Sequence, residues 1–326
     1  MSIEYLFQSI SEELKKQDIP VKNYTLPRFS TGLFSRLVNT LSLLQFKNGI
    51  VHITGDVYYA VLGAFFAKRI ITIHDLSFLH RTSGITRKVL KLFWVTLPVR
   101  FSHRVTAISE ATKQEILKEV RIEPQKIQVI PDFIDPIYQP FERSFNEANP
   151  RILQVGTAFN KNIERLASAL ENISCTLVII GKLSPKQQEI LQAKGIRFEN
   201  YFRLPIEELY REYCKADMLV FVSTVEGFGM PILEAQASAL PVITSNCSSM
   251  PEVAGDGALL VDPLNIESIR SGIMSVIADK KLRTSLVEAG LQNVKRFSKE
   301  RVAEQYLQLY HSLSNSSDTF KRSEYS

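Results

Sequence analysis

Two glutamates that flank a Gly-x-Gly-x-Pro turn form the segment of this chain best suited to chemistry. Glu226 and Glu234 are separated by seven residues, and they closely follow the apolar run Leu219–Val222. The two glycines let backbone amides approach a ligand, and the proline suits the first turn of a helix. A helix N-terminus carries free N–H groups and partial positive charge, which bind phosphate or sugar-ring oxygens. The pattern predicts a buried strand, a ligand-binding loop and then a helix.

The two acids are suited to different parts of a ligand. Glu226, in the predicted loop, can accept hydrogen bonds from sugar hydroxyls. Glu234 is expected about a turn into the helix, on the side of the loop, where it can accept from a ribose diol. Either acid alone is more simply a helix-end or solvated surface residue. Together, bracketing the turn directly after a strand, they favour the binding interpretation.

Two further residues follow predicted strands. Lys161 lies shortly after Arg151–Val155 and Gly156, at the start of a predicted helix. A lysine is slightly unfavourable against the helix dipole there, which favours a ligand role over a solvated one. His74 follows Arg69–Ile73, at the carboxyl end of a parallel strand, where open α/β sheets bind ligands. Position alone leaves a structural hydrogen-bonding role for His74 equally open.

The elements that would position these residues alternate in type along the chain. Short apolar, β-branched runs alternate with amphipathic stretches, which predicts an α/β fold with βαβ units on two parallel sheets. The expected strands are Gly49–Thr54, Arg69–Ile73, Arg104–Ile108, Lys126–Ile130, Arg151–Val155, Ser174–Ile180, Ile196–Phe198, Met218–Val222, Leu240–Thr244 and Ala258–Val261.

The segment 136–150 separates the two halves. It contains prolines and no periodicity, so it predicts an interdomain linker. The expected domains are therefore residues 1–143 and 144–314, the second ending in a helix over about Lys299–Ser314 that packs back. The polar residues 315–326 are expected to form a disordered tail.

The first residues predict a helix where a strand is usual. Ile3, Leu6, Phe7 and Ile10 share one helical face, with Ser2 placed as the N-cap. A doubly wound domain normally opens with a strand and a glycine-rich turn. The first domain is therefore expected to lack its first strand, either because the gene start was assigned late or because the domain is built that way.

The segment from Glu226 to Glu234 resembles the signature of the retaining glycosyltransferases of the GT-B fold, family four. The likeness extends over the second half of the chain, through 155–162, 179–183, 240–246, 250–256 and 261–263, and more loosely to 52–56, 73–76 and 108–113. The resemblance implies two Rossmann-like doubly wound domains that face each other across a cleft. It also implies front-face substitution, in which the donor phosphate receives the acceptor proton.

One expected residue of the family is replaced. A second phosphate-binding cation, usually arginine, often accompanies the lysine, but Thr157 and Asn160 occupy that stretch. Lys182 and Arg203 are the candidates to supply this charge. With the resemblance, the expected catalytic residues are Glu226, Lys161 and His74. The expected donor-binding residues are Gly156, Thr157, Lys182, Arg203, Gly227, Phe228, Gly229, Met230, Pro231 and Glu234.

The activity that the resemblance implies is transfer of a hexose, mannose-like or glucose/GlcNAc-like, from a GDP- or UDP-sugar. The acceptor would be a saccharide or a lipid-linked saccharide, in surface polysaccharide or O-antigen assembly. No Asp/Glu pair with metal spacing occurs, so neither a metal nor another cofactor is expected, only the nucleotide-sugar as substrate. Two alternatives stay open: a catalytically impaired nucleotide-sugar-binding subunit, and a GT-B-fold sugar epimerase.

The composition limits which classes of binding partner are expected for this chain. The formal charge of +5 fits an anionic substrate or membrane surface, and the sequence has no Lys/Arg-dense stripe typical of nucleic-acid binding. The chain has no apolar run of about 20 residues and no secretion signal, which predicts a cytoplasmic protein. The basic segment 86–100, with Trp94, predicts a core helix of the first domain, or else a peripheral contact with the inner membrane.

Overall fold

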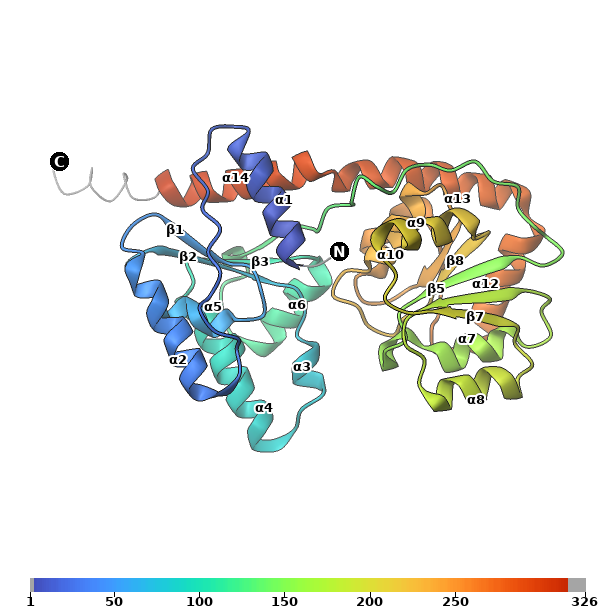
Figure 1. The fold of residues 1–326 in the computed structure, drawn as a ribbon, viewed down its shortest axis with the longest axis horizontal. Helices are drawn as coiled ribbons and strands as arrows, with labels where there is room; N and C mark the ends of the chain where they lie inside the picture. The colour runs from blue at the N-terminus through green and yellow to red at the C-terminus, as the bar shows by residue number, and fades with distance from the viewer. Residues whose placement is uncertain (1–2, 316–326) are drawn as a thin grey trace. The chain divides into compact units, whose positions relative to one another are not determined.

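Residues 3–315 are described by a computed structural model (Figure 1). The chain divides into two compact units. The first unit contains the residues up to Phe133 together with those from Lys299 onward, and the second is Ile134–Ser298. Each unit holds a parallel sheet, so the predicted α/β class is confirmed. Except for Asn315, the tail expected at 315–326 lies outside the described residues.

The sheet of the first unit has four parallel strands in the order β1-β2-β3-β4. They are β1 (Ile50–Ile53), β2 (Lys68–Ile73), β3 (Arg104–Ala107) and β4 (Ile127–Val129). Each lies within one residue of its predicted bounds. The central strands β2 and β3 end in buried apolar runs because helices cover both faces, as parallel sheets require.

The helices that cover this sheet come from segments that are far apart in the sequence. On one face α1 (Ile3–Lys15) lies against α14 (Lys299–Asn315), through Leu6, Ile10 and Tyr306 among others (Figure 1). Within the described residues no strand precedes β1, as the helical pattern of the first residues predicted. The other helical elements are α2 (Gly32–Ser42), η1 (Leu43–Gln45), η2 (Tyr58–Gly63), α3 (Ser77–His80), α4 (Gly84–Leu90), the π-helical η3 (Lys91–Thr96), α5 (Leu97–Phe101), α6 (Glu110–Glu119) and η4 (Pro124–Lys126).

The boundary between the units differs from the predicted one. Residues 134–143 belong to the second unit, and α14 belongs to the first. The guanidinium of Arg143 donates to the backbone oxygens of Tyr213 and Ala216, at 3.1 and 2.8 Å, and the ring of Tyr138 packs edge-on against Tyr213. These contacts fasten the start of the expected linker to the second unit. The chain pattern did not reveal them because the segment has no periodicity.

The sheet of the second unit has six parallel strands in the order β10-β9-β8-β5-β6-β7. From β5 the chain builds outward through β6 and β7, and it then crosses over to β8 and builds the other way. The strand order therefore reverses between β5 and β8, and ligands of open α/β sheets bind beside such a switch point. The strands are β5 (Arg151–Val155), β6 (Thr176–Ile180), β7 (Phe198–Tyr201), β8 (Met218–Phe221), β9 (Val242–Ser245) and β10 (Leu259–Val261).

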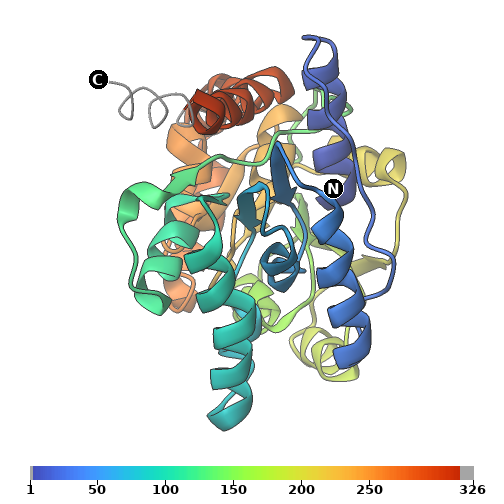
Figure 2. The ribbon, with the colours of Figure 1, turned by 90° about the vertical axis from the view of Figure 1, so that its left-hand side faces the viewer.

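Helices on both faces bury this second sheet. Leu166 of α7 and Ile273 of α12 pack on one face with Leu177 of β6 in a single apolar cluster. Figure 2 gives a second view of the helices and strands, turned by 90° about the vertical axis. The helical elements of the second unit are η5 (Phe159–Lys161), α7 (Ile163–Leu170), α8 (Pro185–Ala193), α9 (Ile206–Lys215), α10 (Met230–Ala237), α11 (Met250–Ala254), η6 (Gly255–Gly257), α12 (Ile266–Ala278), α13 (Lys280–Asn293) and η7 (Val294–Phe297).

A polar cluster around His52 lies inside the first unit, between its sheet and α14. The ring nitrogens of His52 lie 2.8 Å from the Tyr310 hydroxyl and 2.7 Å from the Thr72 hydroxyl, which in turn lies 2.6 Å from that of Thr106. Burial, with a contribution from the charge of His74, lowers the pKa of His52 to about 3. The imidazole is therefore neutral in the folded protein at pH 7.

This half-buried, neutral imidazole predicts that the first unit loses stability as the pH falls. In the unfolded chain the His52 imidazole takes up a proton near pH 6.5, whereas in the folded state it stays neutral down to about pH 3. Between pH 7 and pH 5 the wild type is therefore expected to lose about 1–2 kcal/mol more unfolding free energy than His52→Gln. Urea unfolding followed by the fluorescence of Trp94, the single tryptophan, reports on this unit. Equal losses in both proteins would contradict the assignment.

Candidate functional site

The candidate site lies at the carboxyl ends of the strands of the second unit, on both sides of the switch point. The loop after β5 carries Lys161, and the loop after β8 carries Glu226. These two strands are hydrogen-bonded neighbours, with Ile152 opposite Met218 and Leu153 opposite Leu219. Loops that are well separated in sequence are therefore brought together by the strand order.

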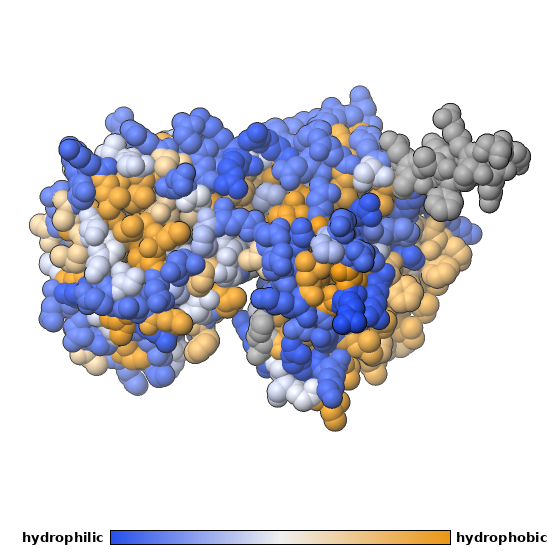
Figure 3. Space-filling view, turned by 180° about the vertical axis from the view of Figure 1, so that it is seen from behind, coloured by the Kyte–Doolittle hydropathy of each residue, from blue (hydrophilic) through white to orange (hydrophobic). Residues whose placement is uncertain are grey.

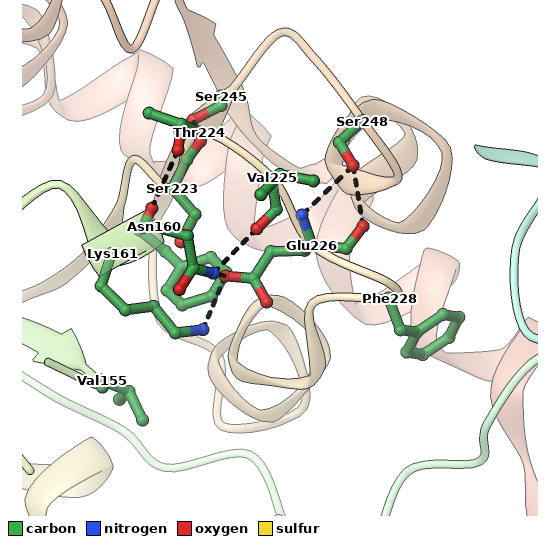
Figure 4. A network of polar contacts seen from close by, with 12 residues as sticks. Val155, Asn160, Lys161, Ser223, Thr224, Val225, Glu226, Phe228, Ser245 and Ser248 are labelled. Atoms are coloured by element: carbon green, nitrogen blue, oxygen red, sulfur yellow. Dashed lines mark hydrogen bonds and ion pairs between the residues drawn. The ribbon is translucent and has the colours of Figure 1, made fainter. Parts of the chain in front are cut away.

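An ion pair joins the two loops. The Lys161 ammonium donates to the carboxylate Oε1 of Glu226 at 2.6 Å, and the amide of Asn160 donates to the same oxygen at 3.1 Å (Figure 4). The side chains of Lys161 and Glu226 retain 17% and 14% of their exposure, so both are largely covered. The ammonium also lies 4.5 Å from the centre of the Phe221 ring. The pair is thus held in place and is still reachable from solvent.

Gly156 makes room for the lysine. It has φ of +90°, and a Cβ built there would lie 2.7 Å from Cε of Lys161. The aliphatic part of the lysine therefore crosses directly over this glycine, which directs the ammonium toward Glu226. Further along, Asn162 adopts the left-handed conformation, with φ of 61°, and starts α7. Its amide donates to the carbonyl of Val222, which ties the start of α7 to the end of β8.

A third loop, after β9, fastens the backbone of the glutamate. The Ser248 hydroxyl accepts from the Glu226 amide at 3.2 Å and lies 2.7 Å from the Glu226 carbonyl oxygen. The Ser249 hydroxyl lies 2.6 Å from the carbonyl oxygen of Phe228. From the β5 side, the amide of Thr224 donates to the Asn160 carbonyl. The loop between β8 and α10 is thereby held from both sides (Figure 4).

The start of α10 leaves its first amides without a side-chain cap. Gly229 occupies the N-cap position with φ of 110° and has no side chain to accept from the first turn. Met230 and Pro231 begin the helix, and both are half-buried. Since the helix N-terminus carries partial positive charge, this end can accept an anionic group beside Lys161. The predicted strand, glycine loop and helix are therefore present in the predicted order.

Glu234 lies deeper than expected. Its side chain is buried, and the Tyr213 hydroxyl donates to its carboxylate Oε2 at 2.6 Å. Burial raises the pKa of this carboxyl. The ring of Tyr138 packs edge-on against Tyr213 beside it. The expected ribose contact of Glu234 stays a prediction, and in this structure the carboxylate faces tyrosines of its own unit.

The remaining predicted cations follow the next strands along the same sheet edge. Lys182 comes after β6, the neighbour of β5, and Arg203 comes after β7, one strand further from Lys161. The Thr157 hydroxyl donates to the Lys182 carbonyl at 2.7 Å, so the loops after β5 and β6 are joined. Both Lys182 and Arg203 are exposed, and the Arg203 guanidinium lies over the ring of Phe202. The strand order therefore favours Lys182 as the second phosphate cation.

The side chains of two other predicted site residues, Phe228 and His74, contact groups other than the Lys161–Glu226 ion pair. The ring of Phe228 is buried against Phe297, 5.8 Å between centroids, and in Figure 4 it points away from Lys161. Only its backbone remains available to a ligand. His74 belongs to the first unit, where its Nε2 lies 3.0 Å from the Thr54 carbonyl oxygen and its ring is largely buried. Its expected contact with the donor sugar stays a prediction.

Sequence reasoning missed the residues that brace the loop. Asn160 was noted only as a replacement for a cation, although its amide bonds Glu226. Ser248 and Ser249 were missed, and the only signal was a short polar run after a predicted strand. Tyr213, which bonds Glu234, was also missed. Within residues 3–315, no group of three or more His, Cys, Asp or Glu side chains is placed to hold a metal ion.

Two family models match this chain, one for each half. The model "Glycosyl transferases group 1" matches residues 138–293, and "Glycosyltransferase Family 4" matches residues 9–137. The chain belongs to the group 1, family 4 glycosyltransferases. This confirms the resemblance found in the sequence.

Relatives of this glycosyltransferase chain include enzymes named for polysaccharide assembly. It is 38% identical over 115 residues to O-antigen chain mannosyltransferase B of Escherichia coli, which covers 35% of this chain and 30% of that protein. It is 29% identical over 214 residues to O-antigen chain mannosyltransferase RfbU of Salmonella typhimurium, covering 63% of this chain and 60% of that one. The chain therefore matches less than two thirds of the length of each.

Solved structures confirm the fold. Sucrose-phosphate synthase from Thermosynechococcus elongatus superimposes with a TM-score of 0.76 at 18% identity, over 97% of this chain and 94% of that one. Anabaena HepE in complex with UDP and glucose superimposes with a TM-score of 0.72 at 17% identity, over 96% of each chain. Two Rossmann-like domains of the GT-B fold are thus the architecture of this glycosyltransferase.

The contact between Gly156 and Lys161 generates a prediction with a matched control. Gly156→Ala is expected to displace the lysine and to weaken binding of GDP or UDP about 10-fold or more, since it disturbs one charge-assisted hydrogen bond. Gly195 also has positive φ, of +63°, but a Cβ there meets nothing within 4 Å. Gly195→Ala should carry similar backbone strain, seen as a similar fall in the melting temperature, with unchanged nucleotide affinity by calorimetric titration. Equal affinities in the two variants would refute this role of Gly156.

Proposed function

We propose that this protein is a retaining glycosyltransferase that moves a hexose from a GDP- or UDP-sugar to a saccharide or lipid-linked saccharide. The observation that carries the proposal is the Lys161–Glu226 ion pair beside the uncapped start of α10, at the switch point of a parallel sheet. A cation, a helix N-terminus and a hydroxyl-accepting carboxylate then lie within one loop cluster. That combination suits a sugar joined to a diphosphate.

The charges of the pair provide a mechanism for donor binding. Without donor, Lys161 and Glu226 neutralise each other. A bound diphosphate would offer Lys161 a second anionic partner, and the carboxylate of Glu226 would then be available to accept from sugar hydroxyls. As the bond to the leaving group breaks, negative charge grows on the diphosphate, and Lys161 with the start of α10 would stabilise it. The front-face substitution expected for retention uses the donor phosphate as the acceptor of the proton.

The names of relatives support the proposed sugar, product and nucleotide. O-antigen mannosyltransferases of two bacteria favour mannose as the sugar and surface polysaccharide as the product. HepE, which was solved with UDP and glucose, favours UDP as the nucleotide. For a lipid-linked acceptor we propose peripheral contact with the cytoplasmic face of the membrane. Within the described residues no helix is long and apolar enough to cross a membrane.

The proposal predicts large losses when either member of the ion pair is removed. Lys161→Ala and Glu226→Ala are each expected to lower kcat/KM for nucleotide release about 10- to 100-fold, because each removes a charge-assisted hydrogen bond of about 1.5–3 kcal/mol. The measurement is nucleotide release over a panel of GDP- and UDP-sugars with a saccharide acceptor. Lys186→Ala is the matched control, since Lys186 also forms an ion pair in this unit, with Glu164, but is exposed on α8.

The same panel separates the alternatives. A binding subunit that cannot catalyse would bind a nucleotide-sugar and release no nucleotide. An epimerase would convert the donor with no acceptor present. Full turnover in both Lys161→Ala and Glu226→Ala would show that this site does not carry the reaction.

A further inference from the structure

The side-chain amide of Asn160 contacts two consecutive residues of the loop after β8. It donates to the carbonyl oxygen of Val225 at 2.8 Å and to Oε1 of the Glu226 carboxylate at 3.1 Å (Figure 4). The two N–H groups of an amide lie in one plane at a fixed angle. The Glu226 carboxylate is therefore tied to the backbone carbonyl of the residue before it, which fixes its direction relative to its own loop.

The turn that carries Asn160 is held by hydrogen bonds. The Asn160 carbonyl oxygen accepts from the Thr224 amide at 2.8 Å, a backbone contact that does not depend on the side chain. Phe159, directly before it, is fully exposed and does not anchor the turn by apolar packing. On the surface of the second unit, at the left of Figure 3, hydrophobic side chains likewise lie in separate groups between hydrophilic ones. Replacing the Asn160 side chain thus removes its amide contacts and leaves the backbone link between the two loops.

Both donors to the Glu226 carboxylate reach the same oxygen. The Lys161 ammonium lies 2.6 Å and the Asn160 amide 3.1 Å from Oε1. Within residues 3–315 no hydrogen bond to the other oxygen, Oε2, is found, and none is drawn in Figure 4. The Glu226 side chain keeps 14% of its exposure. Oε2 is therefore the acceptor that the pair leaves for a hydroxyl group of a ligand.

The two donors differ in how a bound diphosphate would affect them. The Lys161 ammonium is charged, so a diphosphate would compete with Glu226 for it. The Asn160 amide is neutral, and both of its partners lie on the loop after β8, so a diphosphate would attract it far less. When Lys161 turns toward phosphate, Asn160 is the side chain that still directs the Glu226 carboxylate.

We propose that Asn160 is the positioning residue for the transferred sugar. It holds the Glu226 carboxylate toward the sugar hydroxyls while Lys161 is engaged with the diphosphate. This inference rests on the proposed function and deepens it, because it assigns neighbouring residues to different parts of the ligand. Lys161 then contributes to binding of the nucleotide with or without its sugar, whereas Asn160 contributes only when the sugar is present.

Calorimetric titration of GDP-mannose against GDP, and of UDP-glucose against UDP, separates these roles. Asn160→Ala should bind the free nucleotide as the wild type does and the nucleotide-sugar about 10-fold more weakly, because Glu226 loses its orientation. Lys161→Ala should weaken binding of both. The matched control is Asn265→Ala, which removes the two hydrogen bonds by which this side chain caps α12. It should bind both ligands as the wild type does, and the melting temperature shows that each variant is folded.

A double variant shows whether Asn160 acts through Glu226. Glu226→Ala alone is expected to weaken binding of the nucleotide-sugar. Adding Asn160→Ala to it should change that affinity by less than about twofold, because the group that Asn160 orients is already absent. Two residues that contact the sugar independently would instead give losses that multiply.

Every outcome of these titrations bears on the inference. Equal losses for nucleotide and nucleotide-sugar in Asn160→Ala would show that the residue only supports the loop, and would overturn it. An unchanged affinity for the nucleotide-sugar, losses that multiply in the double variant, or a wild type that binds neither nucleotide-sugar would overturn it as well. The expected affinities without nucleotide release from any donor, with a saccharide acceptor present, would instead refute the proposed function alone.

Discussion

The ion pair between Lys161 and Glu226 is the contact on which the candidate site depends. It can form only because β5 and β8 are neighbours in the sheet, although more than sixty residues separate the two side chains. Gly156 leaves room for the aliphatic part of the Lys161 side chain. Serine hydroxyls of the loop after β9 form hydrogen bonds with the backbone around Glu226. The sheet order, the glycine and the braced loop thus serve one arrangement: a cation and a carboxylate beside a helix N-terminus. That arrangement is well suited to a ligand with phosphate at one end and hydroxyls at the other.

Much of this could be predicted from sequence because the signals are local. The ten strands found within residues 3–315 were all expected near their observed positions, since buried parallel strands have short β-branched sequences. Lys161 and Glu226 were found by their places after such strands, next to glycines. Their mutual contact was not predicted, because nothing in the order of residues states which strands are neighbours. The family resemblance supplied the fold, and the sheet topology then explained the pairing.

The features that escaped prediction depend on contacts between distant segments. Tyr213 bonds Glu234 from another helix, so the carboxylate expected near the loop is buried instead. The assignment of α14 to the first unit follows from its packing on α1 at the other end of the chain. For α2, periodicity alone identifies an amphipathic helix but not which side faces the core. The exposure of Leu33, Phe34 and the other apolar residues, together with the buried Asn39, shows that its apolar stripe faces outward.

The most direct test of the site is a crystal structure of the protein with GDP or UDP bound. The account predicts diphosphate oxygens within hydrogen-bonding distance of the Lys161 ammonium and of backbone amides at the start of α10. A polar hollow at the opposite edge of the same sheet, lined by Arg151, Arg197, Glu199, Lys215 and Asp217 among others, is a different place at which a nucleotide could bind. A diphosphate bound there, with Lys161 still paired only to Glu226, would contradict the account.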